Sequence, residues 1–120
     1  MQKLVLAVFV AATVLMAGNA QALSDCQLHV YAVDDQGHLA ASYALGPEHV
    51  QSIEPFDSGV LGEELWHVTL TPEGADINSQ FSAEQIGRQI AILCDGVELV
   101  RPSVRGSSHE SFVFSAPTSP

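Results

Sequence analysis

A short apolar run followed directly by Asp-Gly restricts the fold of this chain more than any other feature. Residues 90–94 (Ile-Ala-Ile-Leu-Cys) carry no polar side chain on either alternate face, which is typical of a strand covered on both sides. Asp95-Gly96 favours a type I′ turn, in which both central residues have positive φ. We therefore expect a central strand at residues 90–94 and an antiparallel strand at 97–100. Pro102 has no N–H for a ladder and should end the pairing.

The residues before this strand predict a helical turn and its end. Ser82 and Gln85 have the spacing of a capping box, in which each side chain satisfies a free backbone N–H at a helix start. A short helical turn is expected to begin there. Gly87 can adopt positive φ, the usual way in which a helix ends.

The chain between residues 28 and 62 gives weaker signals. Apolar and polar residues alternate over 28–33, which predicts a half-buried strand, and residues 34–37 have the composition of a turn. Residues 38–46 fit either a second strand or a segment lying across the sheet. Pro47 is placed to start one or two helical turns up to residue 52. Residues 53–62 have no clear period and predict a loop with room for a short edge strand.

Three further elements are predicted from residue 65 onward. Residues 65–70 alternate, with Trp66, Val68 and Leu70 on one face. Thr71 is a suitable N-cap for a helix from Pro72 to about residue 80, which Gly74 should weaken. Residues 111–115 form a last strand with Phe112 and Phe114 on one face, and residues 116–120 are expected to be a disordered tail.

The N-terminal residues read as a targeting segment. Lys3 precedes an apolar run of about 14 residues, and Ala20-Gln21-Ala22 is a small-x-small cleavage site, so residues 1–22 are expected to be a signal peptide. A retained membrane anchor is the alternative, although a spanning helix needs roughly 20 apolar residues. The 120-residue length then leaves one domain, residues 23–115, in an exported and periplasmic protein.

The charge of the predicted mature chain is strongly negative. Cleavage removes the only lysine and leaves three arginines against fourteen acidic residues, a formal charge of −11. Such a surface repels nucleic acid and anionic lipid headgroups, so neither is an expected partner. The acidity either keeps a small secreted protein in solution or provides a surface for a basic partner.

Two cysteines, Cys26 and Cys94, remain in the predicted mature chain. An even number of cysteines in an exported protein indicates a disulfide. The bridge would close a loop of 68 residues, which the chain-entropy model values at about 4 kcal/mol. Two free buried thiols are the alternative.

With these elements in place, the sequence resembles a known family. Leu45-Gly-Pro-Glu-His-Val50, Trp66-His-Val-Thr-Leu-Thr-Pro-Glu-Gly-Ala75 and the core Gly87-Arg-Gln-Ile-Ala-Ile-Leu-Cys-Asp-Gly96 resemble the head subdomain of the first periplasmic domain of SecD, an accessory subunit of the bacterial protein translocase. The resemblance covers roughly residues 45–115. Its motif residues, to which we assign structural roles, are Gly87, Arg88, Ala91, Asp95, Gly96 and Pro102.

The resemblance implies an α+β head with a mainly antiparallel sheet and one or two short helices packed on it. In the family, this head lies outside the membrane and engages emerging polypeptide, while membrane-embedded segments use the proton gradient. This sequence has no apolar run of spanning length after the signal peptide. A proton-coupled cycle is therefore not expected from it alone.

The apolar face of the predicted strand at residues 111–115 must be covered by other residues. An exposed apolar face that bears Phe112 and Phe114 would favour association. Either residues 26–60 fold over that face, or a partner covers it, which would make the chain a homodimer or a module that binds polypeptides by strand addition.

Nothing in the sequence indicates catalysis. The five histidines (His29, His38, His49, His67 and His109) lack zinc-site spacing, and no Gly-x-Ser-x-Gly elbow or phosphate loop occurs. The adjacent pairs Asp34-Asp35 and Glu63-Glu64 fit solvated turns better than a glycosidase site. We expect no enzyme, no cofactor and no metal. The expected function is a periplasmic binding protein that contacts other polypeptides in export or envelope maintenance; an acidic inhibitor that docks a basic protein is the alternative.

Overall fold

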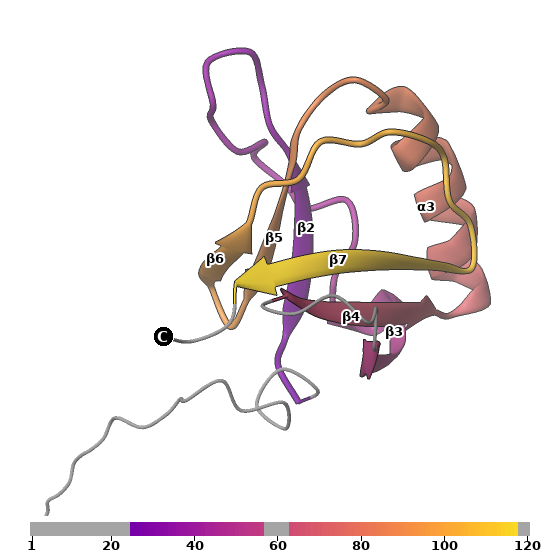
Figure 1. Cartoon of the computed structure of the whole chain (residues 1–120). Helices are drawn as coiled ribbons and strands as arrows, with labels where there is room; N and C mark the ends of the chain where they lie inside the picture. The colour runs from indigo at the N-terminus through magenta and orange to yellow at the C-terminus, as the bar shows by residue number, and fades with distance from the viewer. Residues whose placement is uncertain (1–24, 57–62, 118–120) are drawn as a thin grey trace, which may run out of the picture.

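The computed structural model describes residues 25–56 and 63–117, which form an α+β domain (Figure 1). The predicted signal peptide, residues 1–22, lies outside the described residues. The fold class expected from the sequence is confirmed. The strands form two antiparallel sheets of three strands each, in the orders β2-β5-β6 and β3-β4-β7. The elements are β2 (Leu28–Ala32), η1 (Pro47–His49), β3 (Val50–Phe56), β4 (Glu63–Leu70), α3 (Pro72–Glu84), β5 (Ile90–Cys94), β6 (Val97–Val100) and β7 (Ser111–Pro117).

The first sheet has the predicted central strand and hairpin. Strand β5 lies between β2 and β6, and Ala91 and Ile92 are fully buried on its two faces. Asp95 and Gly96 have φ values of 53° and 84°, as a type I′ turn requires. Strand β6 ends at Val100, two residues before Pro102, and the carbonyl of Pro102 accepts a hydrogen bond from the Ile90 N–H at 3.0 Å.

The disulfide between Cys26 and Cys94 is present, with a Cα–Cα distance of 5.5 Å. It joins the residues just before β2 to the end of β5. The Asp95 carboxylate accepts a hydrogen bond from the Gln27 N–H, and the Gln27 carbonyl accepts one from the Asp95 N–H. The sulfur bridge and this pair of hydrogen bonds together fix the register of the two strands at one end.

The second sheet differs from the prediction at its first strand. Trp66, Val68 and Leu70 of β4 are buried on one face, as expected. Strand β3 begins at Val50, so the predicted helical turn is limited to η1, and the predicted loop is a strand up to Phe56. Pro55 is tolerated because β3 is an edge strand, where a residue without an N–H can face away from the sheet. Strand β7 continues to Pro117, two residues into the segment expected to be a tail.

Helix α3 begins as predicted but ends later. The Thr71 hydroxyl accepts a hydrogen bond from the Gly74 N–H at 3.1 Å, and Pro72 occupies the first turn. The helix continues to Glu84, so the predicted helix start at Ser82 is wrong. The hydroxyl of Ser82 bonds to Ser108 instead of capping a new helix. Gly87 has φ of +85° just beyond the helix end.

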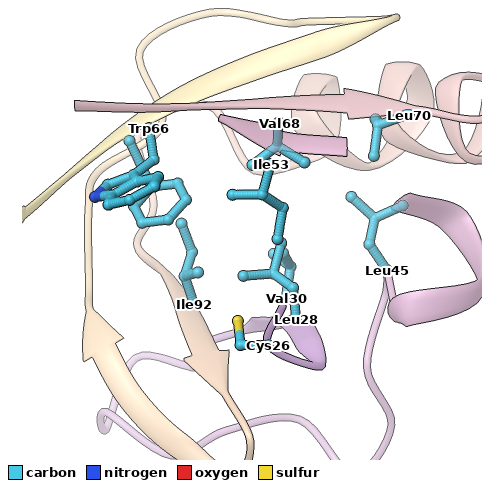
Figure 2. Packing of buried hydrophobic residues seen from close by; sticks show 10 residues of the cluster. Cys26, Leu28, Val30, Leu45, Ile53, Trp66, Val68, Leu70 and Ile92 are labelled. Carbon is cyan, nitrogen blue, oxygen red and sulfur yellow. The ribbon is translucent and has the colours of Figure 1, made fainter. Parts of the chain in front are cut away.

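The two sheets face each other across one hydrophobic core (Figure 2). Leu28, Val30 and Ile92 point from the first sheet toward Ile53, Trp66, Val68 and Leu70 of the second, and Cys26 closes one side. Trp66 is a core residue, as the sequence indicated, and its indole N–H has no hydrogen-bond acceptor among the described residues.

The face of β7 that bears two phenylalanines is covered from within the chain. Phe114 is 4% exposed and belongs to the core, and Phe112 packs against it. Residues 38–45 run back beside β2 and the residue after it, with isolated bridges between Val33 and Leu39 and between Val30 and Leu45. Residues 26–60 therefore supply part of the cover, through Val30 and Leu45, and Ile92 of β5 supplies another part. Among the described residues, no helix has the length and apolar character that crossing a bilayer requires.

Candidate functional site

A pocket of about 270 Å³ lies between the two sheets and the second half of α3. We call it the central pocket. The segment that connects β6 to β7, residues 101–110, covers it, and we call this segment the roof segment (Figure 1). Apolar residues from six parts of the chain line the pocket, among them Val30, Leu45, Phe81, Ile90, Ile92, Val104, Phe112 and Phe114. The lining can therefore accept one large apolar side chain.

Polar side chains of α3 hold the far end of the roof segment. The side-chain N–H₂ of Asn78 donates to the Ser108 hydroxyl at 2.9 Å and to the His109 carbonyl at 3.2 Å. The Ser82 hydroxyl accepts from the Ser108 N–H at 2.9 Å and donates to the Ser108 carbonyl. Asn78 and Ser82 lie four residues apart on one helix face, and both are buried. Their hydrogen bonds fix the height of the roof segment above the pocket.

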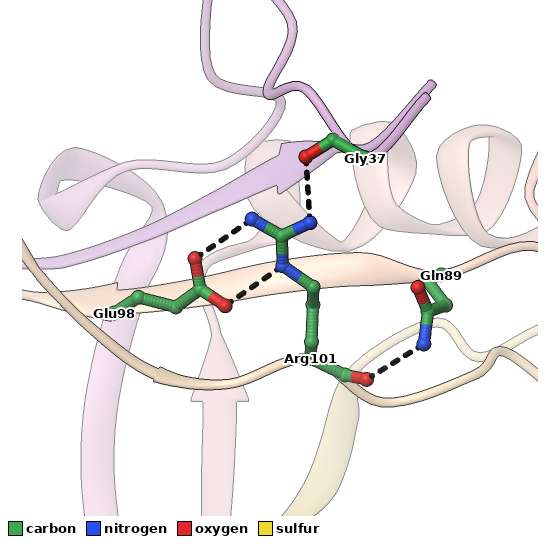
Figure 3. Close-up of polar contacts among 4 residues, drawn as sticks. All are labelled: Gly37, Gln89, Glu98 and Arg101. Carbon is green, nitrogen blue, oxygen red and sulfur yellow. Dashed lines mark hydrogen bonds and ion pairs between the residues drawn. The ribbon is translucent and has the colours of Figure 1, made fainter. Parts of the chain in front are cut away.

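A guanidinium clamp holds the near end of the roof segment (Figure 3). The Nε and Nη2 atoms of Arg101 donate to the two carboxylate oxygens of Glu98 at 2.8 and 3.0 Å, and Nη1 donates to the Gly37 carbonyl at 2.7 Å. This two-point contact lowers the pKa of the Glu98 carboxyl and raises the pKa of Arg101. The clamp also ties the turn at residues 34–37 to the start of the roof segment.

The pocket opens to solvent beside β7. The rim residues Ser103, Arg105 and Val113 are exposed, and Val113 lies on the strand itself. Strand β7 pairs with β4 on one side and is at the edge of its sheet on the other. A sheet edge without a paired strand, part of which lies close to β6, therefore borders the opening of an apolar pocket.

The register shows which backbone groups face that open edge. The Leu70 N–H donates to the Glu110 carbonyl, and the same register pairs Val68 with Phe112 and Trp66 with Phe114. Hydrogen-bonded and non-hydrogen-bonded pairs alternate along an antiparallel ladder. The N–H and C=O groups of Val113 therefore point away from β4, toward the side on which another strand could add.

The six motif residues taken from the family resemblance have structural positions, three beside or in the roof segment and three in or just after β5. Gly87 donates its N–H to the Val104 carbonyl, and the Arg88 carbonyl accepts from the Val104 N–H, so this pair anchors the middle of the roof segment. Pro102 lines the pocket. Ala91 is buried on β5, and Asp95 and Gly96 make the turn.

The histidines that the sequence analysis considered lie apart from one another in the described part of the chain. Residues 25–56 and 63–117 hold no group of three or more His, Cys, Asp or Glu side chains placed to bind a metal ion. His49 is buried, and its Nδ1 accepts a hydrogen bond from the Gly46 N–H at 3.1 Å. His38 lies 3.7 Å from Asp34, and His109 lies 3.4 Å from Asp76, on separate exposed surfaces.

The sequence did not predict the pocket or the buried polar side chains of Asn78 and Ser82 that hold the roof segment over it. The sequence predicted that Phe112 and Phe114 share an apolar face. It gave no functional prediction for Asn78, Phe81 or Val104. One signal was present, because Asn78 and Ser82 are polar residues on the same helix face as Ala75. Polar residues at that spacing on an inward face indicate buried hydrogen bonds to another segment.

Comparison with known proteins establishes the fold alone. No protein-family model and no curated protein matches this sequence. A solved structure of SecDF, described as a membrane component that enhances protein export, is 16% identical with a TM-score of 0.67, and the match covers 81% of this chain and 58% of that chain. SecDF in its super-membrane-facing form is 17% identical with a TM-score of 0.64, covering 81% of this chain and 17% of that chain. The SecD-like fold is confirmed, and assignment to the head subdomain stays a prediction.

Proposed function

We propose that this chain, which shares the fold of part of SecDF, is a non-enzymatic binding module that captures an extended segment of another polypeptide at the central pocket. The observation that carries the proposal is the open edge of β7 beside an apolar pocket. A peptide that adds as a strand to β7 would gain backbone hydrogen bonds from Val113, and alternate side chains would face the pocket. The fold similarity to a component that enhances protein export supports a role in export or envelope maintenance.

The chemistry of the pocket selects the occupant. Three phenylalanines, Phe81, Phe112 and Phe114, contribute to a lining that is mostly apolar. Burying one large apolar side chain there is worth about 1.5–3 kcal/mol, which suits transient capture rather than a permanent complex. Backbone pairing tolerates many sequences, so we expect a preference for one large apolar residue in otherwise variable peptides.

The proposed location is the periplasm. A disulfide between Cys26 and Cys94 persists in oxidising compartments and is rare where thiols are kept reduced. The predicted signal peptide at residues 1–22 would deliver the chain there. Release of the chain by osmotic shock tests the location, and retention of the chain in the cytoplasmic fraction would contradict it.

The binding test uses peptides that differ at one position. We expect a labelled nine-residue peptide with a central Phe to bind more tightly, by fluorescence anisotropy, than the same peptide with a central Gly. Val104→Trp fills the pocket and should weaken the Phe peptide about tenfold, the loss of one buried side chain. Val97→Trp is the matched control, because Val97 is 64% exposed and lies outside the pocket lining. Equal binding of both peptides, or an equal loss with the control variant, would contradict the proposal.

The strand-addition step has its own test. Val113→Pro removes an N–H that faces the open edge but leaves the ladder with β4 intact. We expect it to weaken peptide binding, whereas Val113→Ala, which keeps the N–H, should not. A second copy of the chain is the competing occupant of the same edge. A dimer by sedimentation that Val113→Pro dissociates would replace the polypeptide partner with self-association.

The alternative function, an acidic inhibitor that docks a basic protein, stays a prediction. It differs from strand addition in its response to salt, because screening weakens contacts between exposed charges and leaves apolar burial in place. Peptide capture that disappears at high ionic strength would favour this alternative.

A further inference from the structure

The outer face of β2 carries a cluster of aromatic rings that takes no part in the core. Leu28 and Val30 point inward and are buried, so His29 and Tyr31 point to the opposite face. Tyr43, from the segment that runs back beside β2, lies against both rings. Its ring centroid is 4.7 Å from that of His29 and 6.3 Å from that of Tyr31, with edge-to-face geometry in both pairs. None of these three residues lines the central pocket.

A carboxylate is fixed beside these rings. The Tyr43 hydroxyl donates to Oε2 of Glu48 at 2.7 Å, and Nε2 of His49 lies 3.9 Å from the same oxygen. This hydrogen bond lowers the pKa of the Glu48 carboxyl, so the group is charged at neutral pH. No described side chain bonds Oε1, and the Glu48 side chain is 54% exposed. The Glu48 backbone N–H also donates to this carboxylate. The carboxylate is therefore held in place, and because it is half exposed and has about four lone-pair sites, it can accept further donors.

Gly46 leaves room for the Tyr43–Glu48 pair because it has no side chain. A Cβ at Gly46 would lie 2.5 Å from Cε1 of Tyr43 and 2.6 Å from Oε1 of Glu48. Real Cβ atoms do not approach other atoms so closely, so any side chain at this position would displace both groups. Gly46 has φ of −130°, which every residue can adopt, so its role here is the close approach and not an unusual backbone angle.

The structure contains a direct comparison for this carboxylate. Glu98 is also on the surface, and it is paired at two points with the guanidinium of Arg101. Glu48 has a tyrosine as its partner and no arginine. The other described arginines do not supply one, because Arg88 lies 3.9 Å from Asp35 and Arg105 is on the rim of the central pocket.

We propose that His29, Tyr31, Tyr43 and Glu48 form a binding site for an arginine side chain of a partner polypeptide. A guanidinium is planar and always charged, it stacks on aromatic rings, and it donates to carboxylate oxygens. These are the properties that match three rings and a fixed, exposed carboxylate. The formal charge of −10 for the whole chain would attract such a partner from a distance. The proposal does not rest on the function proposed above, because the two surfaces share no residue.

The test uses three short peptides with one variable residue: acetyl-Gly-Gly-X-Gly-Gly-amide with X as arginine, lysine or citrulline. Binding is followed by shifts of the Tyr43 and His29 ring signals in aromatic NMR spectra. We expect the arginine peptide to bind more tightly than the lysine peptide, and the citrulline peptide, which has the same shape without the charge, to bind least. Equal binding of citrulline, or tighter binding of lysine, would overturn the assignment.

Variants separate this site from general electrostatic attraction. Glu48→Gln should weaken the arginine peptide about fivefold, as expected for loss of one exposed ion pair next to aromatic rings. Glu73→Gln, which removes an exposed carboxylate at the start of α3, is the matched control and should leave binding of the arginine peptide unchanged. Tyr43→Leu should also weaken binding, and unchanged Trp66 fluorescence would show that this variant folds. An equal loss in Glu73→Gln would identify diffuse charge attraction and overturn the site.

One further variant keeps the two proposals apart. Val104→Trp fills the central pocket and should leave the arginine peptide unaffected. If it abolished binding of the arginine peptide, the peptide would be entering the pocket, and the site on the outer face of β2 would be wrong. If Val104→Trp abolished capture of the Phe peptide alone, both proposals would stand independently.

Discussion

At the residue scale, two glycines hold positions for reasons other than flexibility. A side chain at Gly46 would collide with the Tyr43–Glu48 pair, and a side chain at Gly74 would collide with η1, which packs against the first turn of α3. A Cβ at Gly74 would lie 2.7 Å from the His49 carbonyl oxygen and 2.8 Å from the His49 Cβ. The His49 carbonyl also accepts a hydrogen bond from the Thr71 N–H at 2.9 Å, so it is fixed from two sides.

Gly74→Ala should reverse the usual helix preference. Alanine inside a helix normally stabilises by about 1 kcal/mol relative to glycine, but overpacking costs about 1–3 kcal/mol. We expect the free energy of unfolding to fall by about 1 kcal/mol, measured by urea denaturation. Gly106→Ala is the control, because a Cβ there meets no atom within 4 Å. A stabilised Gly74→Ala variant would show that η1 does not pack as described.

The Tyr43–Glu48 hydrogen bond should be visible in a pH titration. The nearby Glu48 carboxylate raises the pKa of Tyr43 above its usual 10.0. A group whose pKa is raised by folding contributes stability below its unfolded pKa and loses it as pH rises through the folded pKa, so this contribution disappears above about pH 10. Tyrosinate absorbance in a Tyr31→Phe background isolates Tyr43. Glu48→Gln should move the Tyr43 pKa back toward 10.0, and no change would mean that the hydrogen bond is absent in solution.

At the element scale, the roof segment is a loop held by side chains of other elements. Asn78→Ala removes two hydrogen bonds and leaves the polar groups of Ser108 and His109 without partners, which should lower stability by about 1–3 kcal/mol. Amide exchange at Ser108 should accelerate. Ser79→Ala, an exposed change on the next residue of α3, should alter stability by less than about 0.5 kcal/mol. Equal effects of the two changes would remove Asn78 from its anchoring role.

The disulfide connects two elements that are distant in the sequence. Cys26→Ala combined with Cys94→Ala should lower the free energy of unfolding by about 4 kcal/mol, because the 68-residue loop is no longer closed in the unfolded chain. Reductant should reproduce that loss in the natural chain and have no effect on the double variant. A reductant effect that persists in the double variant would point to another cause.

Local patterns predicted the elements well where one signal dominated. The alternation in β4, the apolar run in β5 and the Asp95-Gly96 turn are each determined by neighbours in sequence. The predicted end of α3 was wrong because Ser82 and Gln85 have the spacing of a capping box. The Ser82 hydroxyl instead hydrogen-bonds to a residue 26 positions away. Strand β3 was underestimated because Pro55 disfavours a strand unless it lies at an edge, which depends on sheet order.

At the scale of the whole molecule, the two sheets share one core and should unfold together. Trp66 and Val68 of one sheet pack in the same cluster as Val30 and Ile92 of the other. Native-state amide exchange should therefore give Val68 and Ile92 the same opening free energy, equal to that of global unfolding followed by Trp66 fluorescence. A lower value for either sheet would show that it opens by itself.

The central pocket could not be predicted because it exists only once the two sheets are placed face to face. Val30, Phe81, Ile92 and Phe112 belong to four elements, and no sequence spacing relates them. The division of the strands into two sheets is likewise a property of long-range packing. The sequence supports the fold class and the disulfide, while the site depends on how elements separated by up to about 80 residues come together.

The sulfur bridge also determines how this domain would respond to being pulled. Cys26 is joined to Cys94, so tension applied at the start of the chain passes through the covalent bridge directly to β5 and not along the hydrogen bonds of β2. The residues between the two cysteines cannot be drawn out while the bridge is intact. Under load the domain would lengthen only by releasing the portion after Cys94, which contains β6, the roof segment and β7.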